Sequence, residues 1–264
     1  MHEKIFSGAP VFPRILSIGP VTLHSYGLMV FIAVVAAWFV LKKEFAGRIA
    51  ARRLEDIVFY SLLCGFVMAR LFHFVFWDFG ALADNPLEFF YVWHGGLAVG
   101  GGIIGGFLAL FYFSRKEKIP FAEFCDYFAA PMILGQAIGR IGCFLAGCCY
   151  GSSCGTLPGV TFTDPASLAP LGAGLHPVQI YESLLNFLLF LLIIRLPLKK
   201  TGLRGAAYLA GYGITRFFME FIRGDSITAF SGLTIMQIIA IILVISAGLY
   251  LTAVSQKAKN EKRI

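Results

Sequence analysis

The chain has 264 residues, of which 58% are hydrophobic and only 14% are charged. Soluble domains average about 25% charged residues, so a soluble fold of this length could not hide so much apolar surface. The formal net charge of +7 would suit a nucleic-acid-binding module only if the basic residues formed one face of a soluble domain, and here they lie between apolar segments. The composition therefore indicates an integral membrane protein and excludes a partner nucleic acid.

The apolar segments have the length of membrane spans, which need about 20 residues each. In chain order they cover residues 24–41, 57–77, 94–113, 122–145, 179–196, 205–222 and 232–254. They predict an all-α integral membrane protein with about seven transmembrane helices. Since no polar linker or repeat divides the chain, we expect a single transmembrane domain over 1–264, with an external loop over about 146–177.

Basic residues lie on alternate loops of this predicted bundle, which gives its orientation. Cytoplasmic loops carry an excess of Lys and Arg. The segments after the first, third, fifth and seventh spans hold 16 of the 22 Lys and Arg residues: Lys42, Lys43, Arg48, Arg52, Arg53, Arg115, Lys116, Lys118, Arg195, Lys199, Lys200, Arg204, Lys257, Lys259, Lys262 and Arg263. We therefore expect the N-terminus outside and the C-terminus in the cytoplasm.

Four further arginines lie within or beside the predicted helices: Arg70, Arg140, Arg216 and Arg223. An arginine inside the hydrocarbon region is costly and marks a candidate functional site. The alternative is that the side chain extends from a helix end to the membrane–water interface. For Arg70 and Arg223 both interpretations remain open. Arg140 and Arg216 lie a turn or more inside their helices. With the predicted orientation, all four fall in the outer half of the membrane.

Other polar residues are expected at the same depth, where Tyr26, His94 and Glu182 open their spans. Glu220 follows Arg216 by four residues and shares its helix face, so it either neutralises that arginine or helps to form a site. Several guanidinium groups facing one cavity favour a bound phosphate, and a phospholipid headgroup is the phosphate at hand. His94, followed by two glycines, is either a structural histidine or a base that works near neutral pH.

Cys143, Cys148, Cys149 and Cys154 fall within one 12-residue window on the predicted outer side. Outside the cytoplasm they could form disulfides, and small buried thiols can also simply fill space. A thiol used in catalysis or redox chemistry is the second interpretation. The paired C-x-x-C spacing of common zinc sites is missing, so no metal site is predicted.

Several motifs together resemble the bacterial prolipoprotein diacylglyceryl transferase family. The resemblance runs in order along nearly the whole chain. The matching segments are His24-Ser25-Tyr26-Gly27, His94-Gly95-Gly96-Leu97, Gly139-Arg140-Ile141-Gly142, His176-Pro177-Val178-Gln179-Ile180-Tyr181-Glu182 and Tyr212-Gly213-Ile214-Thr215-Arg216-Phe217-Phe218-Met219-Glu220-Phe221-Ile222-Arg223.

The resemblance implies an enzyme of the bacterial inner (plasma) membrane that needs no cofactor or metal and whose active site faces outward. Its partners would be phosphatidylglycerol, a preprolipoprotein signal peptide with a lipobox cysteine, and the lipid bilayer. The reaction would move a diacylglyceryl group to that cysteine thiol and release glycerol phosphate. The resemblance places functional residues at Tyr26, His94, Arg140, Gly151 and Arg216.

The chemistry of these residue types suits the reaction. His94 can take the proton that a thiol must lose, Arg140 and Arg216 can stabilise the departing phosphate ester, and Tyr26 can orient the lipid through its hydroxyl. Glu182, Gly151, Glu220 and Arg223 join the arginines as expected substrate-binding residues.

The central signature departs from the family pattern Gly-Arg-x-Gly-Asn-Phe-x-Asn-x-Glu-x-x-Gly. Three polar positions of that pattern are Cys143, Ala146 and Cys148 in this chain. Three alternatives therefore stay open beside the family reaction: a divergent paralogue with another acceptor, a membrane thiol-redox protein, and an anion transporter.

Overall fold

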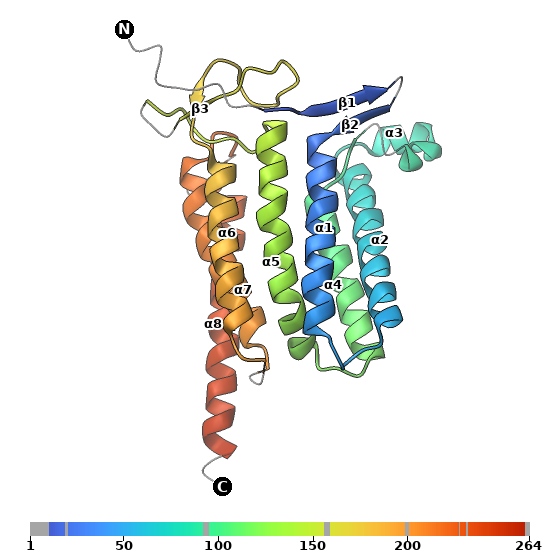
Figure 1. Cartoon of the computed structure of the whole chain (residues 1–264), viewed down its shortest axis with the longest axis vertical. Helices are drawn as coiled ribbons and strands as arrows, with labels where there is room; N and C mark the ends of the chain where they lie inside the picture. Colours follow the sequence, from blue (N-terminus) through green and yellow to red (C-terminus); the bar gives the residue numbers. More distant parts are fainter. Residues whose placement is uncertain are drawn as a thin grey trace. The chain divides into compact units, whose positions relative to one another are not determined.

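The computed structural model describes residues 11–18, 21–91, 95–155, 159–198, 201–226, 228–230 and 232–261. The described part of the chain is mostly helical (Figure 1). A helix lies in each of the seven predicted windows: α1 (Ser25–Glu44), α2 (Ala51–Phe76), α4 (Val99–Lys116), α5 (Phe121–Ala146), α6 (Val178–Arg195), α7 (Leu203–Met219) and α8 (Ile235–Glu261). The short α3 (Phe79–Asp84), η1 (Pro86–Phe90) and η3 (Glu220–Ile222) lie between them.

Five of these helices are long and apolar enough to cross a membrane: α1, α2, α5, α6 and the Ile235–Gln256 part of α8. Large apolar side chains on the helices face outward, for example Phe39 (66% exposed), Ile103 (68%) and Leu249 (66%). Such a surface would be a liability in water and is what contact with lipid requires. The predicted class, an all-α membrane protein, is confirmed. The expected orientation, the single domain over 1–264 and the external loop over 146–177 stay predictions.

Helix boundaries differ from the apolar windows where backbone chemistry overrides hydropathy. The third window begins at residue 94, but α4 begins at Val99 because Gly95 and Gly96 have φ values of +83° and +79°. Such left-handed conformations cannot continue an α-helix. The second helix instead begins six residues before its window, since Ala51, Arg52 and Arg53 are good helix formers although two of them are charged.

The chain forms two compact units: residues 42–124 make a small unit, and residues 1–41 with 125–264 make a large unit. In the large unit, α1 packs closely on α5, because a methyl group at Gly142 would approach Met29 Cβ to 2.9 Å. The α7 helix packs similarly on α8 through Gly213. Asp126 of α5 accepts hydrogen bonds from the backbone N–H groups of Gly202 and Gly205, which fixes the start of α7.

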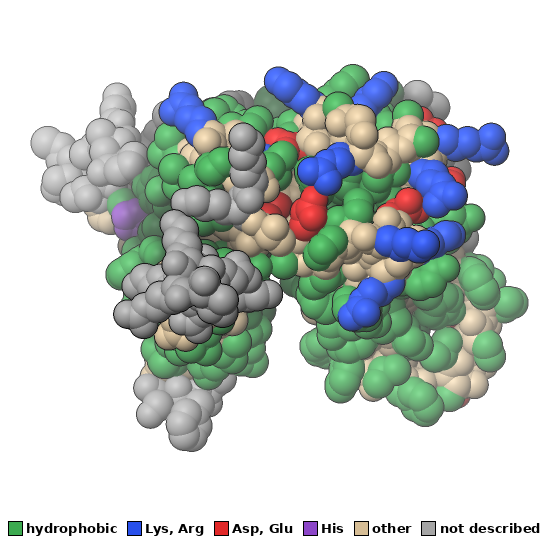
Figure 2. All heavy atoms as spheres, turned by 90° about the horizontal axis from the view of Figure 1, so that it is seen from below, with side chains coloured by type: hydrophobic (Ala, Val, Ile, Leu, Met, Phe, Trp, Pro, Cys, Tyr) green, Lys and Arg blue, Asp and Glu red, His purple; other side chains and the backbone are tan. Residues whose placement is uncertain are grey.

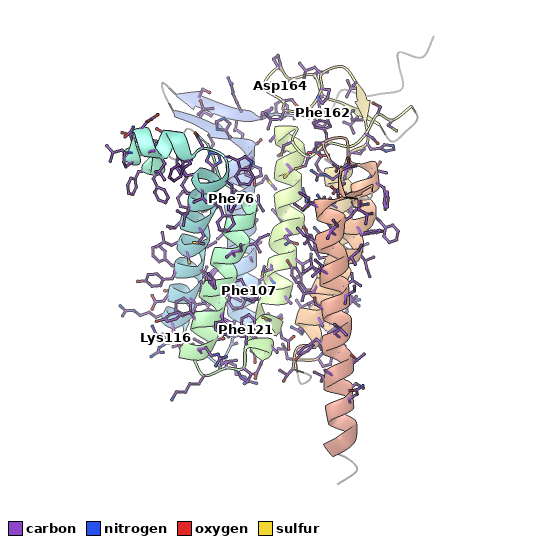
Figure 3. The ribbon with its side chains drawn as sticks, turned by 180° about the vertical axis from the view of Figure 1, so that it is seen from behind. Phe76, Phe107, Lys116, Phe121, Phe162 and Asp164 are labelled. Carbon is purple, nitrogen blue, oxygen red and sulfur yellow. The ribbon has the colours of Figure 1, made fainter. Side chains whose placement is uncertain are left out.

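In the small unit, α2 and α4 lie side by side. Gly101 and Gly105 face backbone carbonyl oxygens of α2 so closely that any side chain there would collide, so these glycines allow the two helices to pack closely. Phe121 packs against Phe107 with ring centroids 5.2 Å apart, and Figure 3 shows both near the end of α4 that carries Lys116, away from Phe76.

Basic side chains gather where α2 begins and α4 ends, and Figure 2 views the molecule onto this end. Arg48 and Arg53 form exposed ion pairs there with Glu123 and Glu117, at 3.1 and 2.9 Å. This clustering is the pattern from which the cytoplasmic side was predicted.

Arg70 is 2% exposed and has a structural role that neither sequence interpretation anticipated. Its guanidinium group donates hydrogen bonds to the carbonyl oxygens of five residues in η1 and in the chain between η1 and α4: Glu88 (2.7 Å), Phe89 (3.1 Å), Tyr91 (3.1 Å), Gly95 and Gly96 (3.0 Å). A guanidinium group has five N–H donors in a fixed fork, so one side chain can satisfy this set. Arg70 therefore holds both flanks of residues 92–94.

Short antiparallel strand pairs complete the described structure, and hydropathy had not predicted them. They are β1 (Arg14–Ile18) with β2 (Val21–His24), β3 (Val160–Thr161) with β4 (Gly174–Leu175), and β5 (Thr228–Phe230) with β6 (Leu233–Thr234). The first pair leads directly into α1. Beyond α5, Phe162 is fully buried beside Phe144, in the same segment as Asp164 (Figure 3).

We predict that Arg70→Lys lowers the free energy of unfolding by about 3 kcal/mol or more, because an ammonium group with three donors cannot replace the hydrogen bonds of this buried guanidinium group to five carbonyl oxygens. Unfolding in SDS would measure the loss, and limited proteolysis between residues 85 and 97 would show the segment released. Arg48→Lys is the matched control, since its exposed ion pair contributes about 1 kcal/mol or less. Equal stabilities of the two variants would contradict this role for Arg70.

Candidate active site

The end of α5 is shaped by a glycine turn that folds the chain back over the helix. Gly147 has a φ of +74°, its N–H bonds to the carbonyl of Phe144 at 3.1 Å, and the N–H of Cys148 bonds to the carbonyl of Cys143 at 3.1 Å. This is the Schellman pattern of helix termini, which needs a left-handed residue and favours glycine. The turn places Cys148 and Cys149 beside the last turns of α5, where Arg140 and Cys143 lie.

Glu182, in the first turns of α6, joins arginines from two other helices. Its side chain is 3% exposed, one carboxylate oxygen pairs with Arg140 Nε, and the other lies 2.9 Å from Arg216 Nη1 of α7. An unpaired buried charge is very costly, whereas a carboxylate shared by two guanidinium groups is compensated. The structure places Glu182 as the link between α5, α6 and α7. Its predicted part in substrate binding stays a prediction.

Glu220 continues this network beyond the end of α7. It lies 2.7 Å from Arg216 Nη2 and 3.9 Å from Arg223 Nε, and it accepts a hydrogen bond from Ser226 Oγ at 2.7 Å. The i, i+4 pair of Arg216 and Glu220 was predicted, and its geometry agrees with the neutralising interpretation.

Arg223 lies just beyond the predicted span 205–222, and the structure places it outside α7. The helix ends at Met219, η3 follows, and Arg223 has extended backbone paired with Gly151. Its side chain is 9% exposed and holds Asp225 with two parallel hydrogen bonds, Nε to Oδ1 at 3.0 Å and Nη2 to Oδ2 at 2.8 Å. The 3-10 turn redirects the chain so that Arg223 faces the cysteine turn: Cys149 and Asp225 both raise the pKa of Arg223, against the lowering effect of burial.

The three acids Glu182, Glu220 and Asp225 equal the three arginines in number. The N–H donors of the arginines, however, are not equally occupied. Arg216 uses both terminal nitrogens on Glu182 and Glu220. Arg140 pairs with Glu182 through Nε, 18% of its side chain is exposed, and in the described part of the chain its Nη1 and Nη2 make no hydrogen bond to a carboxylate or carbonyl oxygen. Arg140 therefore keeps two N–H-bearing nitrogens for a phosphate, which guanidinium groups bind bidentately.

Gly151 lies in a three-segment backbone crossing beside this network. Its N–H bonds to the carbonyl of His176 at 3.1 Å, the N–H of Ser152 bonds to Ile222 at 2.8 Å, and the N–H of Gly224 bonds to Tyr150 at 3.0 Å. A side chain at residue 151 would collide with His176 and Val178. Gly151 thus allows the start of α6 and the chain after α7 to pack against the turn that carries Cys148 and Cys149. In this structure the glycine positions these segments.

Tyr26, predicted from the start of α1, does lie near the site. It is 47% exposed, and a methyl group at Gly142 would approach its Cδ2 to 3.4 Å. The prediction that Tyr26 shares a site with Arg140 agrees with this placement.

Sequence reasoning missed a polar extension of the site toward the middle of the bundle. Gln136 Nε2 donates to the Tyr208 hydroxyl at 2.8 Å, and the rings of Tyr208 and Tyr212 are stacked 6.1 Å apart. Gln136 is one helical turn before Arg140, and Tyr212 is one turn before Arg216, so the spacing of four residues was the available signal. It went unnoticed because uncharged polar residues do not interrupt an apolar window.

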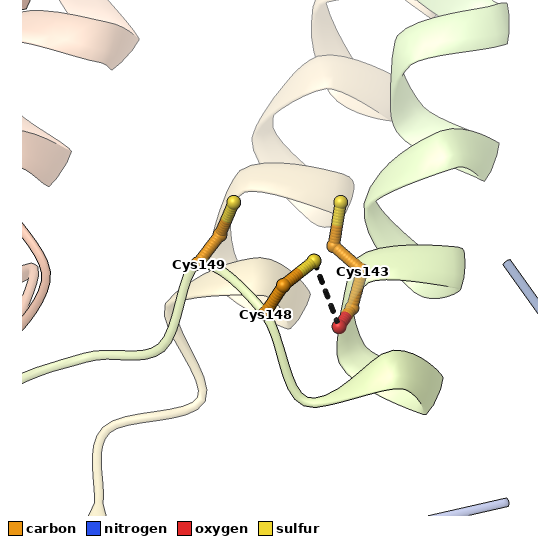
Figure 4. Close-up of side chains that lie close together, drawn as sticks. All are labelled: Cys143, Cys148 and Cys149. Atoms are coloured by element: carbon orange, nitrogen blue, oxygen red, sulfur yellow. Dashed lines mark hydrogen bonds between the residues drawn. The ribbon is translucent and has the colours of Figure 1, made fainter. Parts of the chain in front are cut away.

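The Cys143, Cys148 and Cys149 sulfur atoms all lie within 4.8 Å of one another (Figure 4). None of the six cysteines forms a disulfide in this structure, and Cys154 lies outside this group. Hydrogen bonds from the Cys143 and Cys148 thiols lower the pKa of Cys149, and Arg223 and Arg140 act in the same direction. Side-chain hydrogen bonding with Cys143 and Cys149, together with burial, raises the pKa of Cys148. We call Cys143, Cys148 and Cys149 the thiol cluster.

His94, the predicted base, lies outside the described residues, so its role stays a prediction. The flanking residues held by Arg70 belong to the small unit.

We predict that Glu182→Gln lowers the free energy of unfolding by about 3 kcal/mol or more, because removing one partner of a buried ion pair leaves an uncompensated charge. The amide retains the side-chain shape, so SDS unfolding would isolate the effect of charge. Glu123→Gln, which breaks an ion pair with the exposed Arg48, is the control and should cost about 1 kcal/mol or less. A Glu182→Gln protein as stable as this control would show that the network is not held by charge.

A second prediction concerns the thiols. Because its pKa is lowered, Cys149 remains a thiolate below the ordinary thiol pKa of about 8.5, whereas Cys148 remains protonated. In reduced, metal-free protein near pH 7, iodoacetamide should therefore modify Cys149 before Cys148, as mapped by tandem mass spectrometry. Faster labelling of Cys148, or a Cys149 rate that rises with pH around 8.5, would contradict the assignment.

Comparison with known proteins gives the chain a family. Residues 13–253 match the family described as Prolipoprotein diacylglyceryl transferase. Three similar proteins, each named phosphatidylglycerol–prolipoprotein diacylglyceryl transferase, come from Halalkalibacterium halodurans (32% identity over 94% of this chain and 86% of that protein), Photorhabdus laumondii (31%, 99% and 98%) and Stenotrophomonas maltophilia (33%, 93% and 92%). These matches confirm the resemblance seen in the motifs, and the chain belongs to the prolipoprotein diacylglyceryl transferase family.

Proposed function

We propose that this protein transfers a diacylglyceryl group from phosphatidylglycerol to the lipobox cysteine of a preprolipoprotein. The names of the relatives state these substrates, and the chain matches them over most of its length. The observation that carries the proposal in this chain is Arg140, a partly exposed guanidinium group with two uncommitted nitrogens, fixed by a buried carboxylate at the end of a transmembrane helix.

The two arginines have different roles in this proposal. Arg140 binds the phosphate of the lipid headgroup through Nη1 and Nη2, while Glu182 holds its Nε. Arg216, with both terminal nitrogens occupied by Glu182 and Glu220, holds the carboxylates in place and contributes positive charge at a distance. Tyr26, exposed beside them, orients the headgroup through its hydroxyl.

In the transfer step, the sulfur of the lipobox cysteine attacks the diacylglyceryl carbon that carries the phosphate ester oxygen. A carbon–sulfur bond forms, the carbon–oxygen bond breaks, and its electron pair leaves on glycerol phosphate. Arg140 stabilises the negative charge that develops on this leaving group. The acceptor thiol must first lose its proton, and His94 is the proposed base. The site faces the outer leaflet of the bacterial inner membrane, on the side opposite to the basic loops.

The test is to incubate purified protein with headgroup-labelled phosphatidylglycerol and a lipobox peptide, and to measure lipidated peptide and released glycerol phosphate. We expect both products from the native chain. Arg140→Lys should reduce transfer by about 100-fold or more, since a point charge cannot replace a bidentate donor at the leaving group. Arg115→Lys, a substitution in the basic loop after α4, is the control and should retain activity.

The outcomes separate the alternatives. Glycerol phosphate without lipidated peptide would replace the proposed acceptor by another one, and absence of both products would overturn the proposed activity. Full transfer by Arg140→Lys would remove Arg140 from phosphate binding.

A further inference from the structure

The thiol cluster consists of residues that the proposed transfer does not use. Cys143 lies in the last turn of α5, and the Schellman turn brings Cys148 and Cys149 back beside it. The three sulfur atoms converge although the sequence spacing, C-x4-C-C, is not the paired spacing of common metal sites. The fold thus brings three sulfur atoms together although their spacing in the sequence did not predict a metal site.

Simple packing does not account for this group. Each of the three residues is only partly buried, whereas space-filling thiols are among the most buried side chains. Cys149 has a φ of +58°, a left-handed conformation that is costly for a residue with a side chain and that gathers at functional sites. The backbone is therefore held in an unfavourable conformation at the residue that completes the cluster.

We propose that Cys143, Cys148 and Cys149 form a three-thiolate site for a thiophilic d10 cation, Zn²⁺ or Cu⁺. Zinc–sulfur bonds are about 2.3 Å long, so sulfur atoms around one ion lie about 3.8–4.0 Å apart. The observed separations, all within 4.8 Å, reach this range with small side-chain rotations. Thiolate ligands select these soft ions over Mg²⁺ or Ca²⁺. Three sulfur ligands leave a fourth tetrahedral position open on Zn²⁺ and complete a trigonal site for Cu⁺.

The surroundings suit the charge of such a site. Three thiolates with Zn²⁺ carry a net charge of −1, and the guanidinium groups of Arg140 and Arg223 both act on Cys149. These cations would compensate the charge in a region of low polarity. The site would also clamp the end of α5 to the chain that enters the crossing at Gly151.

The experiment measures metal directly. Protein purified anaerobically and fully reduced is loaded with Zn²⁺ or with Cu⁺, freed of excess ion, and assayed for metal per chain. We expect one equivalent of one of these ions. With Co²⁺ as a probe, thiolate-to-metal charge-transfer absorption should appear. Alanine replacement of Cys143, Cys148 or Cys149 should each weaken binding by at least about 100-fold, because loss of a mere supporting residue around a metal already costs about 10- to 100-fold.

Cys154→Ala is the matched control, since this thiol lies in the same segment but outside the cluster, and it should bind metal like the native chain. Thermal unfolding of the metal-free variants shows whether each one folds. Failure of the reduced native protein to bind either ion, or unchanged binding by folded Cys149→Ala, would overturn the proposal. Since metal content is measured without lipid, this result is independent of the transfer assay.

Discussion

The buried ionic network of Arg140, Glu182, Arg216 and Glu220 is the constraint on which the large unit depends. Charges in a region of low polarity must be paired and hydrogen-bonded, because the cost of an isolated buried ion exceeds the whole stability of a typical domain. The pairs join α5, α6 and the end of α7. The positions of these three helix ends are therefore fixed by electrostatics as well as by apolar packing.

The same network explains how several arginines can lie close together and still leave donors available for a phosphate. If every guanidinium nitrogen had a carboxylate partner, no donor would remain for a phosphate. If no guanidinium group had a carboxylate partner, the positive charges of the arginines would repel each other. Glu182 avoids both situations, because its carboxylate pairs with one nitrogen of Arg140 and one nitrogen of Arg216. The Nη1 and Nη2 atoms of Arg140 therefore stay available and point in a fixed direction. Fixed donors need little rearrangement when charge develops on a leaving group, which is the main source of electrostatic catalysis.

Much of this arrangement could be predicted from the sequence, because hydropathy, charge and family motifs are local signals. They gave seven helical windows and brought Arg140, Arg216 and Glu220 to one region. They could not give the role of Arg70, since its partners are backbone carbonyl groups, which every sequence has. They also could not show that α7 ends at Met219, because the 3-10 turn at Glu220 leaves no mark in the apolar pattern.

The cysteines that replace polar residues of the family signature lie close to the proposed phosphate site, so the charge of the thiol cluster affects phosphate binding there. With protonated thiols, the three acids Glu182, Glu220 and Asp225 balance the three arginines, so a phosphate meets a neutral site with oriented donors. Each thiolate adds one negative charge near Arg140 and weakens the attraction for that phosphate. Three thiolates around Zn²⁺ add −1, no more than ionisation of Cys149 alone, whereas three around Cu⁺ add −2. Of the two ions that suit the sulfur geometry, Zn²⁺ therefore disturbs the neighbouring anion site less, and its open fourth position can accept an oxygen ligand.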